Sequence, residues 1–270
     1  MSTYVMSDIH GHFDEFQLML NQIGFSEEDE LILAGDYVDR GFQTLEILNW
    51  IEQCPDNVLL LKGNHDVEFA ECINIMDKLN KKCGFDEKNT DETQKLYKAI
   101  KGIAEIQNAY FDYYGTIENL IMDKEVTLHE LKRWAVLIKE MPYVYKRTVN
   151  GKKFVIVHAG YYEDDSASSE ELEHFYIYAR EKAYITGGTK GATIIAGHTP
   201  TIIKGLPMYT GGKVYRFYDK KKDCTFYDID CGCGYKESDC FQNGNLACIR
   251  LEDEQVFYIS DDGYREEKDI

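Results

Sequence analysis

The chain has few basic residues, few prolines and no long apolar run. Among its 270 residues, 30 are Lys or Arg and 48 are Asp or Glu, which gives a formal net charge of −18. Such a surface repels the phosphate backbone of nucleic acids, so we expect no nucleic-acid partner. The longest apolar runs, such as 154–157 and 193–196, are too short to cross a bilayer, so we expect no membrane partner either.

Two further absences bear on the cellular location and on the eight cysteines. No basic stretch followed by an apolar segment opens the chain, which predicts a cytoplasmic protein without a secretion signal. Disulfides are then not expected. The cluster Cys231, Cys233, Cys240 and Cys248 also lacks the paired C-x-x-C spacing of a structural zinc site. We therefore interpret these residues as ordinary thiols.

The first quarter of the chain alternates between two hydrophobic periods. Residues 3–6, 31–34 and 58–61 are short apolar runs typical of strands, whereas 14–23 and 44–51 carry apolar residues at helical spacing. This alternation predicts a βαβαβ unit, which is a parallel sheet covered by helices. In such sheets, functional groups lie beyond the carboxyl ends of the strands.

The rest of the chain indicates more helices and then more strands. The pattern over residues 67–141 predicts a helical insertion. Its apolar residues between 103 and 121, mainly Ile and Tyr, recur every three or four positions, which predicts one buried helical face. We expect those tyrosines to pack rather than to bind. One helix is expected over 170–184, and the later strands predict a second, largely antiparallel sheet. Because no linker composition interrupts residues 1–270, we expect a single α/β domain with two sheets between helical layers.

Five short polar motifs each follow a predicted strand. In chain order they are Asp8-Ile9-His10, Gly35-Asp36 with Asp39-Arg40-Gly41, Gly63-Asn64-His65-Asp66, His158-Ala159-Gly160 and Gly197-His198-Thr199. Carboxylate, imidazole and amide donors suit borderline-hard divalent ions such as Mn²⁺, Fe²⁺ and Zn²⁺. Each motif alone is common in unrelated proteins, but five of them in order at strand ends indicate one site.

These residue types match the needs of metal-assisted hydrolysis of a phosphate ester. Two cations about 3.5–4 Å apart need a bridging carboxylate, and together they activate a shared water. The departing alkoxide needs a proton, which a histidine can supply when a carboxylate keeps it protonated. Arginine forks match the oxygens of a phosphate in geometry and in charge. The sequence therefore predicts a two-metal phosphoesterase.

The order and wording of the motifs resemble the phosphoprotein phosphatase family of calcineurin-like metallophosphoesterases, in its small bacterial and phage serine/threonine phosphatase branch. The resemblance runs from Asp8 to the stretches 229–232 and 244–251. It implies a four-layer α/β/β/α sandwich and two divalent metal ions, with Mn²⁺ preferred and Fe or Zn as alternatives.

The resemblance also implies a role for each motif residue. Six residues would hold the metals: Asp8, His10, Asp36, Asn64, His158 and His198. Asp36 would bridge the two ions. His65 would be the general acid, paired with Asp39, and Arg40, Arg180 and Asn64 would bind the substrate phosphate. For Arg180 the alternative is an exposed helix arginine.

The choice of substrate depends on few residues. By resemblance, Asp39 and Thr199 favour a phosphatase acting on phosphoserine, phosphothreonine or other phosphomonoesters, so the expected partner is a phosphorylated protein or a small phosphoester. Asp66 favours the sister branch, the diadenosine tetraphosphate hydrolases. A third reading, a catalytically silent binding scaffold, is disfavoured because a binding module has no need of a general acid such as His65.

Overall fold

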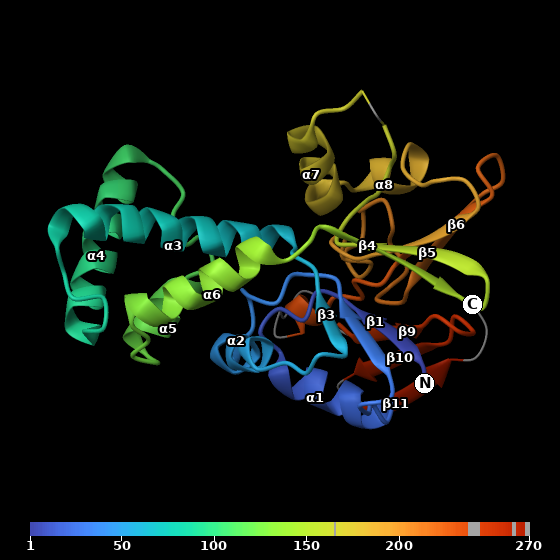
Figure 1. Cartoon of the computed structure of the whole chain (residues 1–270), viewed down its shortest axis with the longest axis horizontal. Helices are drawn as coiled ribbons and strands as arrows, with labels where there is room; N and C mark the ends of the chain where they lie inside the picture. The colour runs from blue at the N-terminus through green and yellow to red at the C-terminus, as the bar shows by residue number, and fades with distance from the viewer. Residues whose placement is uncertain (165, 237–243, 261–262, 268–270) are drawn as a thin grey trace.

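The computed structural model describes residues 1–164, 166–236, 244–260 and 263–267. Two β-sheets lie face to face between helices, in layers that run from the bottom to the top of Figure 1. The first sheet has the strand order β11-β10-β9-β1-β2-β3. Its strands are β1 (Thr3–Met6), β2 (Glu30–Leu33), β3 (Val58–Leu60), β9 (Leu246–Arg250), β10 (Val256–Ser260) and β11 (Gly263–Glu267).

The second sheet has the strand order β4-β5-β6-β8-β7. Its strands are β4 (Val144–Val149), β5 (Lys152–Val157), β6 (Ala192–Ala196), β7 (Tyr215–Asp219) and β8 (Cys224–Asp228). The expectation of a largely antiparallel second sheet is wrong, because β5, β6 and β8 are parallel and only the edge strands are antiparallel. The strands β9 to β11 instead extend the first sheet: β9 is antiparallel to β1, and β10 and β11 are each antiparallel to the strand before.

The side chains of each sheet alternate between two hydrophobic layers. Val5 and Ile32 face the second sheet, whereas Met6 and Leu33 pack under the helices of the first. On the second sheet, Val157 faces the opposite outer layer. The outer helices are α1 (Phe13–Gln22) and α2 (Thr44–Glu52) on one side and α7 (Ser169–Tyr178) and α8 (Glu181–Ile185) on the other. The period of two along a strand thus produces the expected four-layer sandwich.

A helical lobe projects from one side of the sandwich, on the left of Figure 1. It consists of α3 (Asn64–Cys83), α4 (Thr90–Gln107), α5 (Thr116–Met122) and α6 (Leu128–Glu140). This lobe corresponds to the predicted insertion at 67–141. Its buried Ile73 and Trp134 belong to the same hydrophobic cluster as Leu33 of the first sheet. The lobe and the first sheet therefore share one core.

The expected single buried face over residues 103–121 is wrong. Helix α4 ends because Asn108 adopts a left-handed backbone with φ of 52°, and a connection leads from there to α5. Asp112 in this connection accepts hydrogen bonds from backbone N–H groups at the start of α5. Tyr110 and Tyr113 are 88% and 72% exposed, so the prediction that they pack in the core is also wrong.

The expected single helix over 170–184 is interrupted at Ala179 and Arg180. In a continuous helix, the amide of Arg180 would donate to the carbonyl of Tyr176. That carbonyl instead accepts from the amide of Ala159 at 2.7 Å. Helix α7 therefore ends at Tyr178 and α8 begins at Glu181, so that Arg180 lies between the two helices.

Cys231, Cys233 and Cys248 are buried free thiols, and Cys240 lies outside the described residues. Cys233 begins the short 3-10 helix η1 (Cys233–Tyr235).

Over the described ranges, no helix has the length and apolar character needed to span a bilayer.

Candidate metal centre and catalytic site

The loops after β1, β2, β3, β5 and β6 converge at one edge of the sandwich. Six of their residues have a left-handed backbone, with φ between 47° and 72°: Asp8, His10, Asp36, Asp39, Arg40 and His198. This conformation is uncommon for residues other than glycine, and such strain concentrates at functional sites. The turns thereby point polar side chains from separate strands towards one place.

Two glycines allow the carboxylates of the site to lie against neighbouring loops. A Cβ at Gly63 would overlap the carboxylate of Asp36, and a Cβ at Gly197 would overlap the carboxylate of Asp8. Both motif glycines are thus needed for close approach rather than for flexibility. The five motifs identified from the sequence are brought together as predicted.

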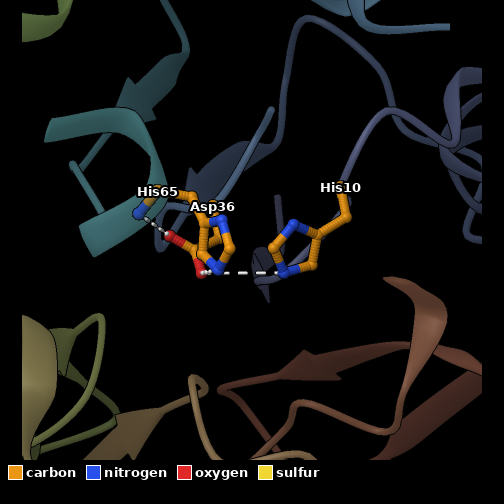
Figure 2. A group of neighbouring side chains, drawn as sticks. All are labelled: His10, Asp36 and His65. Carbon is orange, nitrogen blue, oxygen red and sulfur yellow. Dashed lines mark hydrogen bonds and ion pairs between the residues drawn. The ribbon is translucent and has the colours of Figure 1, made fainter. Parts of the chain in front are cut away.

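Asp36 lies at the centre of the site, between residues of different loops (Figure 2). Its Oδ2 is 3.6 Å from Nε2 of His10, 3.9 Å from Nε2 of His65 and 3.3 Å from Nε2 of His158. Two buried groups have a geometry that could hold a metal ion: one is His10, Asp36 and His65, and the other is Asp36, His158 and His198. Asp36 belongs to both groups, as a carboxylate that bridges two ions would.

Hydrogen bonds orient the imidazoles for metal binding. A carbonyl oxygen can only accept, so Nδ1 of His10 donates to the carbonyl of Val38 at 2.8 Å, and Nδ1 of His158 donates to that of Ala34 at 2.9 Å. Each bond leaves Nε2 directed at the carboxylates. Metal-binding histidines are commonly fixed in this way. Oδ1 of Asn64 lies 3.1 Å from Nε2 of His158 and completes this group of donors.

Asp8 adds a second carboxylate on the side of His10. Its Oδ1 lies 3.9 Å from Nε2 of His10, and its Oδ2 accepts from the backbone N–H of His198 at 3.1 Å. Burial raises the pKa of Asp8 to about 6. Burial lowers the pKa of both His10 and His198 well below the usual value, which favours the neutral imidazole that binds metals.

The electrostatics of Asp36 also fit a bound cation. Burial alone would raise its pKa, but the positive charges of His158 and His65 outweigh this and hold the pKa well below its ordinary value. Burial likewise opposes charge on His158, yet Asp36 raises the pKa of His158 to about 10. A buried carboxylate of this kind needs a positive partner, which a divalent ion would supply in place of the histidine proton.

His65 and Asp39 form a buried pair beside the metal ligands. Nδ1 of His65 lies 2.6 Å from Oδ2 of Asp39, and the other oxygen of Asp39 accepts from Oγ1 of Thr116 at 2.5 Å. Burial would lower the pKa of His65, but the charge of Asp36 and the hydrogen bond to Asp39 raise it above its usual value. Nε2 of His65 faces the two groups of metal-donor residues, where it could bind an ion or donate a proton.

Both predicted phosphate-binding arginines line a cavity of about 230 Å³ at this centre. The guanidinium of Arg40 lies over the ring of Tyr235, 4.2 Å from its centroid, and Nη2 of Arg40 is 3.4 Å from Nε2 of His65. Arg180 donates from Nη1 to the carbonyl of His198 at 3.3 Å. The helix break brings Arg180 to the edge of the site, where it lines the cavity although its side chain is exposed, so its role in binding phosphate stays a prediction.

Sequence reasoning missed several residues of the site. Asp230, Tyr114, Tyr178 and Glu68 also line this cavity, and Thr116 contacts Asp39. The position of Asp230 just after β8 is a signal that the strand-end rule could have used. The others come from helices and a connection whose approach to the site depends on tertiary packing.

Asp66 has a structural role in the site, where its carboxylate holds the backbone of the neighbouring loops. It is fully buried, and its carboxylate accepts from the backbone N–H groups of Gly63, Asp36 and Tyr37 at 2.8–2.9 Å. It therefore fixes the loop that carries Asp36. Because Asp66 is directed at the backbone, its identity does not bear directly on the substrate.

A family model described as calcineurin-like phosphoesterase matches residues 1–221. The chain belongs to the calcineurin-like metallophosphoesterases, and it is accordingly a phosphoester hydrolase. Divalent metals are the cofactors of this family, and the buried His and Asp groups around Asp36 are able to hold them.

Two curated relatives and one solved structure extend the comparison. The "Bis(5'-nucleosyl)-tetraphosphatase, symmetrical" of Actinobacillus pleuropneumoniae serotype 3 is 35% identical over 109 residues, 40% of this chain and 37% of that protein. The protein of the same name from Glaesserella parasuis serovar 5 is 46% identical over 74 residues, 27% of each chain. The match thus spans well under half of either relative. A crystal structure of a candidate diadenosine tetraphosphatase has a TM-score of 0.52 at 14% identity, covering 96% of this chain and 92% of the other, and shares the fold.

Proposed function

We propose that the chain hydrolyses phosphoesters at a centre of two divalent ions that share Asp36. The observation that carries the proposal is the membership of Asp36 in two separate groups of buried metal donors. Six residues would hold the ions: Asp8, His10, Asp36, Asn64, His158 and His198. When bound, the ions would lower the pKa of a shared water and neutralise the phosphoryl oxygens. Mn²⁺ suits the mixed oxygen and nitrogen donors, and Fe or Zn are alternatives.

The remaining residues handle the phosphate and the leaving group. Arg40, Arg180 and Asn64 would bind the phosphoryl oxygens. As water forms its bond to phosphorus and releases a proton to solvent, the bond from phosphorus to the leaving oxygen would break, and Nε2 of His65 would give its proton to that oxygen. The leaving oxygen is the ester oxygen of a phosphomonoester or the bridging anhydride oxygen of a polyphosphate. Asp39 holds His65 through Nδ1 and favours the protonated ring. Water attacks the phosphorus directly, so no phosphorylated enzyme is formed.

The substrate that these observations support best is a dinucleoside polyphosphate. The two curated relatives carry that activity in their names. The tyrosines predicted to pack in the core include Tyr110 and Tyr113, which are instead exposed and could contact a base. Phosphomonoesters, including phosphoserine and phosphothreonine, remain the second candidate, favoured by the His65–Asp39 pair.

A direct comparison of substrates tests this ranking. Wild-type protein supplied with Mn²⁺ would be assayed on diadenosine tetraphosphate and on a phosphothreonine peptide. We expect kcat/KM to be at least about tenfold higher for the dinucleotide, equivalent to about 1.4 kcal/mol of transition-state stabilisation. A tenfold preference for the peptide would establish the second candidate instead.

A further inference from the structure

A larger cavity, of about 600 Å³, opens beside the metal centre. It is adjacent to the smaller cavity at the candidate metal centre, because Glu68 and Tyr114 line both. Its volume is in the range of about 300–1,000 Å³ that is typical of small-molecule sites. Five aromatic residues form much of its wall: Phe69, Tyr110, Phe111, Tyr113 and Tyr114.

Three of these rings form a row that leads outwards from His65. The ring of Tyr114 lies 4.9 Å from that of His65, the ring of Tyr113 lies 5.0 Å from that of Tyr114, and the ring of Tyr110 lies 6.0 Å from that of Tyr113. Exposure rises along the row, from 44% at Tyr114 to 88% at Tyr110. Contiguous exposed aromatics of this kind mark a binding surface rather than a core.

The charges of the cavity restrict what it can accept. Its wall includes the carboxylates of Glu68, Glu71 and Asp112, and none of the described residues that line it is Lys or Arg. A second phosphate group would be repelled there. A planar, uncharged ring would stack on the tyrosines, and its amino groups could donate to a carboxylate. A nucleobase has both properties.

We propose that the 600 Å³ cavity binds a base of the substrate, with Tyr113 and Tyr110 as the stacking residues that determine specificity. This inference rests on the proposed function, because it assumes a nucleotide whose phosphate chain reaches the ions. It assigns the tyrosine row, which belongs to the connection between α4 and α5, to substrate selection. Tyr114 lines both cavities, and its ring lies beside that of His65, the proposed proton donor.

Tyrosine variants test the proposal on two substrates. Tyr113→Ala and the double variant Tyr110→Ala/Tyr113→Ala should lower kcat/KM for diadenosine tetraphosphate by roughly 5- to 100-fold, chiefly through KM, as expected when base stacking is lost. Their kcat/KM for phosphoserine, which carries no ring, should stay within about twofold of wild type. Tyr113→Phe keeps the stacking face and should behave as wild type. Tyr218→Ala, at a 48% exposed tyrosine on β7, is the matched control.

The outcomes separate the inference from the proposed function. If wild type hydrolyses the dinucleotide but the alanine variants lose nothing, or lose equally on both substrates, the base site is wrong and the proposed function stands. If wild type prefers a phosphopeptide and the alanine variants impair only the peptide, the cavity binds a peptide side chain, and both the base site and the proposed substrate are overturned.

Discussion

At the scale of single residues, the site depends on a few atoms held in strained turns. Asp36 has a left-handed backbone, and its carboxylate lies within 4 Å of three imidazole nitrogens. Nδ1 of His65 is held by Asp39, and its Nε2 faces the carboxylate of Asp36, where we propose that it donates a proton. The sequence could predict these residues because each follows directly after a strand in a short motif.

Replacing Asp36 tests the bridge. Asp36→Asn should lose bound metal and activity together, because an amide cannot supply the negative charge that two cations share. Elemental analysis with a hydrolysis assay would measure both quantities, and Asp14→Asn, at an exposed residue of α1, is the control. Two tightly bound ions per chain in Asp36→Asn would show that the bridging assignment is wrong.

Replacing His65 separates acid catalysis from metal binding. His65→Asn should leave the metal content unchanged and lower kcat by about 10²–10⁴ on an alkyl phosphate, the usual range for loss of a general acid. The loss should be smaller with p-nitrophenyl phosphate, since this leaving group needs little protonation. A loss of metal would instead make His65 a ligand, and equal losses on both esters would exclude a role in proton transfer.

At the scale of elements, the αβ alternation and the capping boxes could be predicted because they depend on local sequence. Thr127 and Glu130 form a capping box at the start of α6, and Ser168 and Glu171 form one at the start of α7. The break after α7 could not be predicted, because it depends on a carbonyl taken by the distant Ala159. The placement of β9 to β11 in the first sheet also depends on distant pairing.

The hydrogen bond from Thr116 of α5 to Asp39 can be tested by substitution. Thr116→Val removes the hydroxyl that donates to Asp39, and a hydrogen bond to a charged group is worth about 1.5–3 kcal/mol. We expect a loss of this order in the free energy of unfolding, measured in urea, together with a lower kcat. Thr116→Ser keeps the hydroxyl and should recover most of both. If Thr116→Val matches wild type in stability and in kcat, this contact has no part in holding Asp39.

At the scale of the whole molecule, the charge of −18 gives no general attraction for an anionic substrate. We expect the attraction to be local, from bound divalent ions and from Arg40 and Arg180, which line the cavity at the centre of the site. The core shared by the helical lobe and the first sheet supports the proposal that residues 1–270 form a single domain. The cytoplasmic location stays a prediction.

Removing the metals should change global stability. Asp8 and Asp36 are both buried, and the charge of Asp36 adds to burial in raising the pKa of Asp8, so bound cations would stabilise both carboxylates. Chelation should therefore lower the Tm, and the transition should remain single if the chain is one domain. Mn²⁺ at about 100 times its Kd should restore about 2.7 kcal/mol per site. An unchanged Tm after chelation, checked by calorimetry, would contradict a structural contribution from the ions, and two separate transitions would contradict the single domain.

The central claim is that two ions share the carboxylate of Asp36. Anomalous diffraction from crystals of the Mn²⁺-loaded protein tests it most directly. We expect two peaks about 3.5–4 Å apart, one on each side of the Asp36 carboxylate, with His10 beside one peak and His158 beside the other. A single peak, or two peaks that do not both contact Asp36, would contradict it.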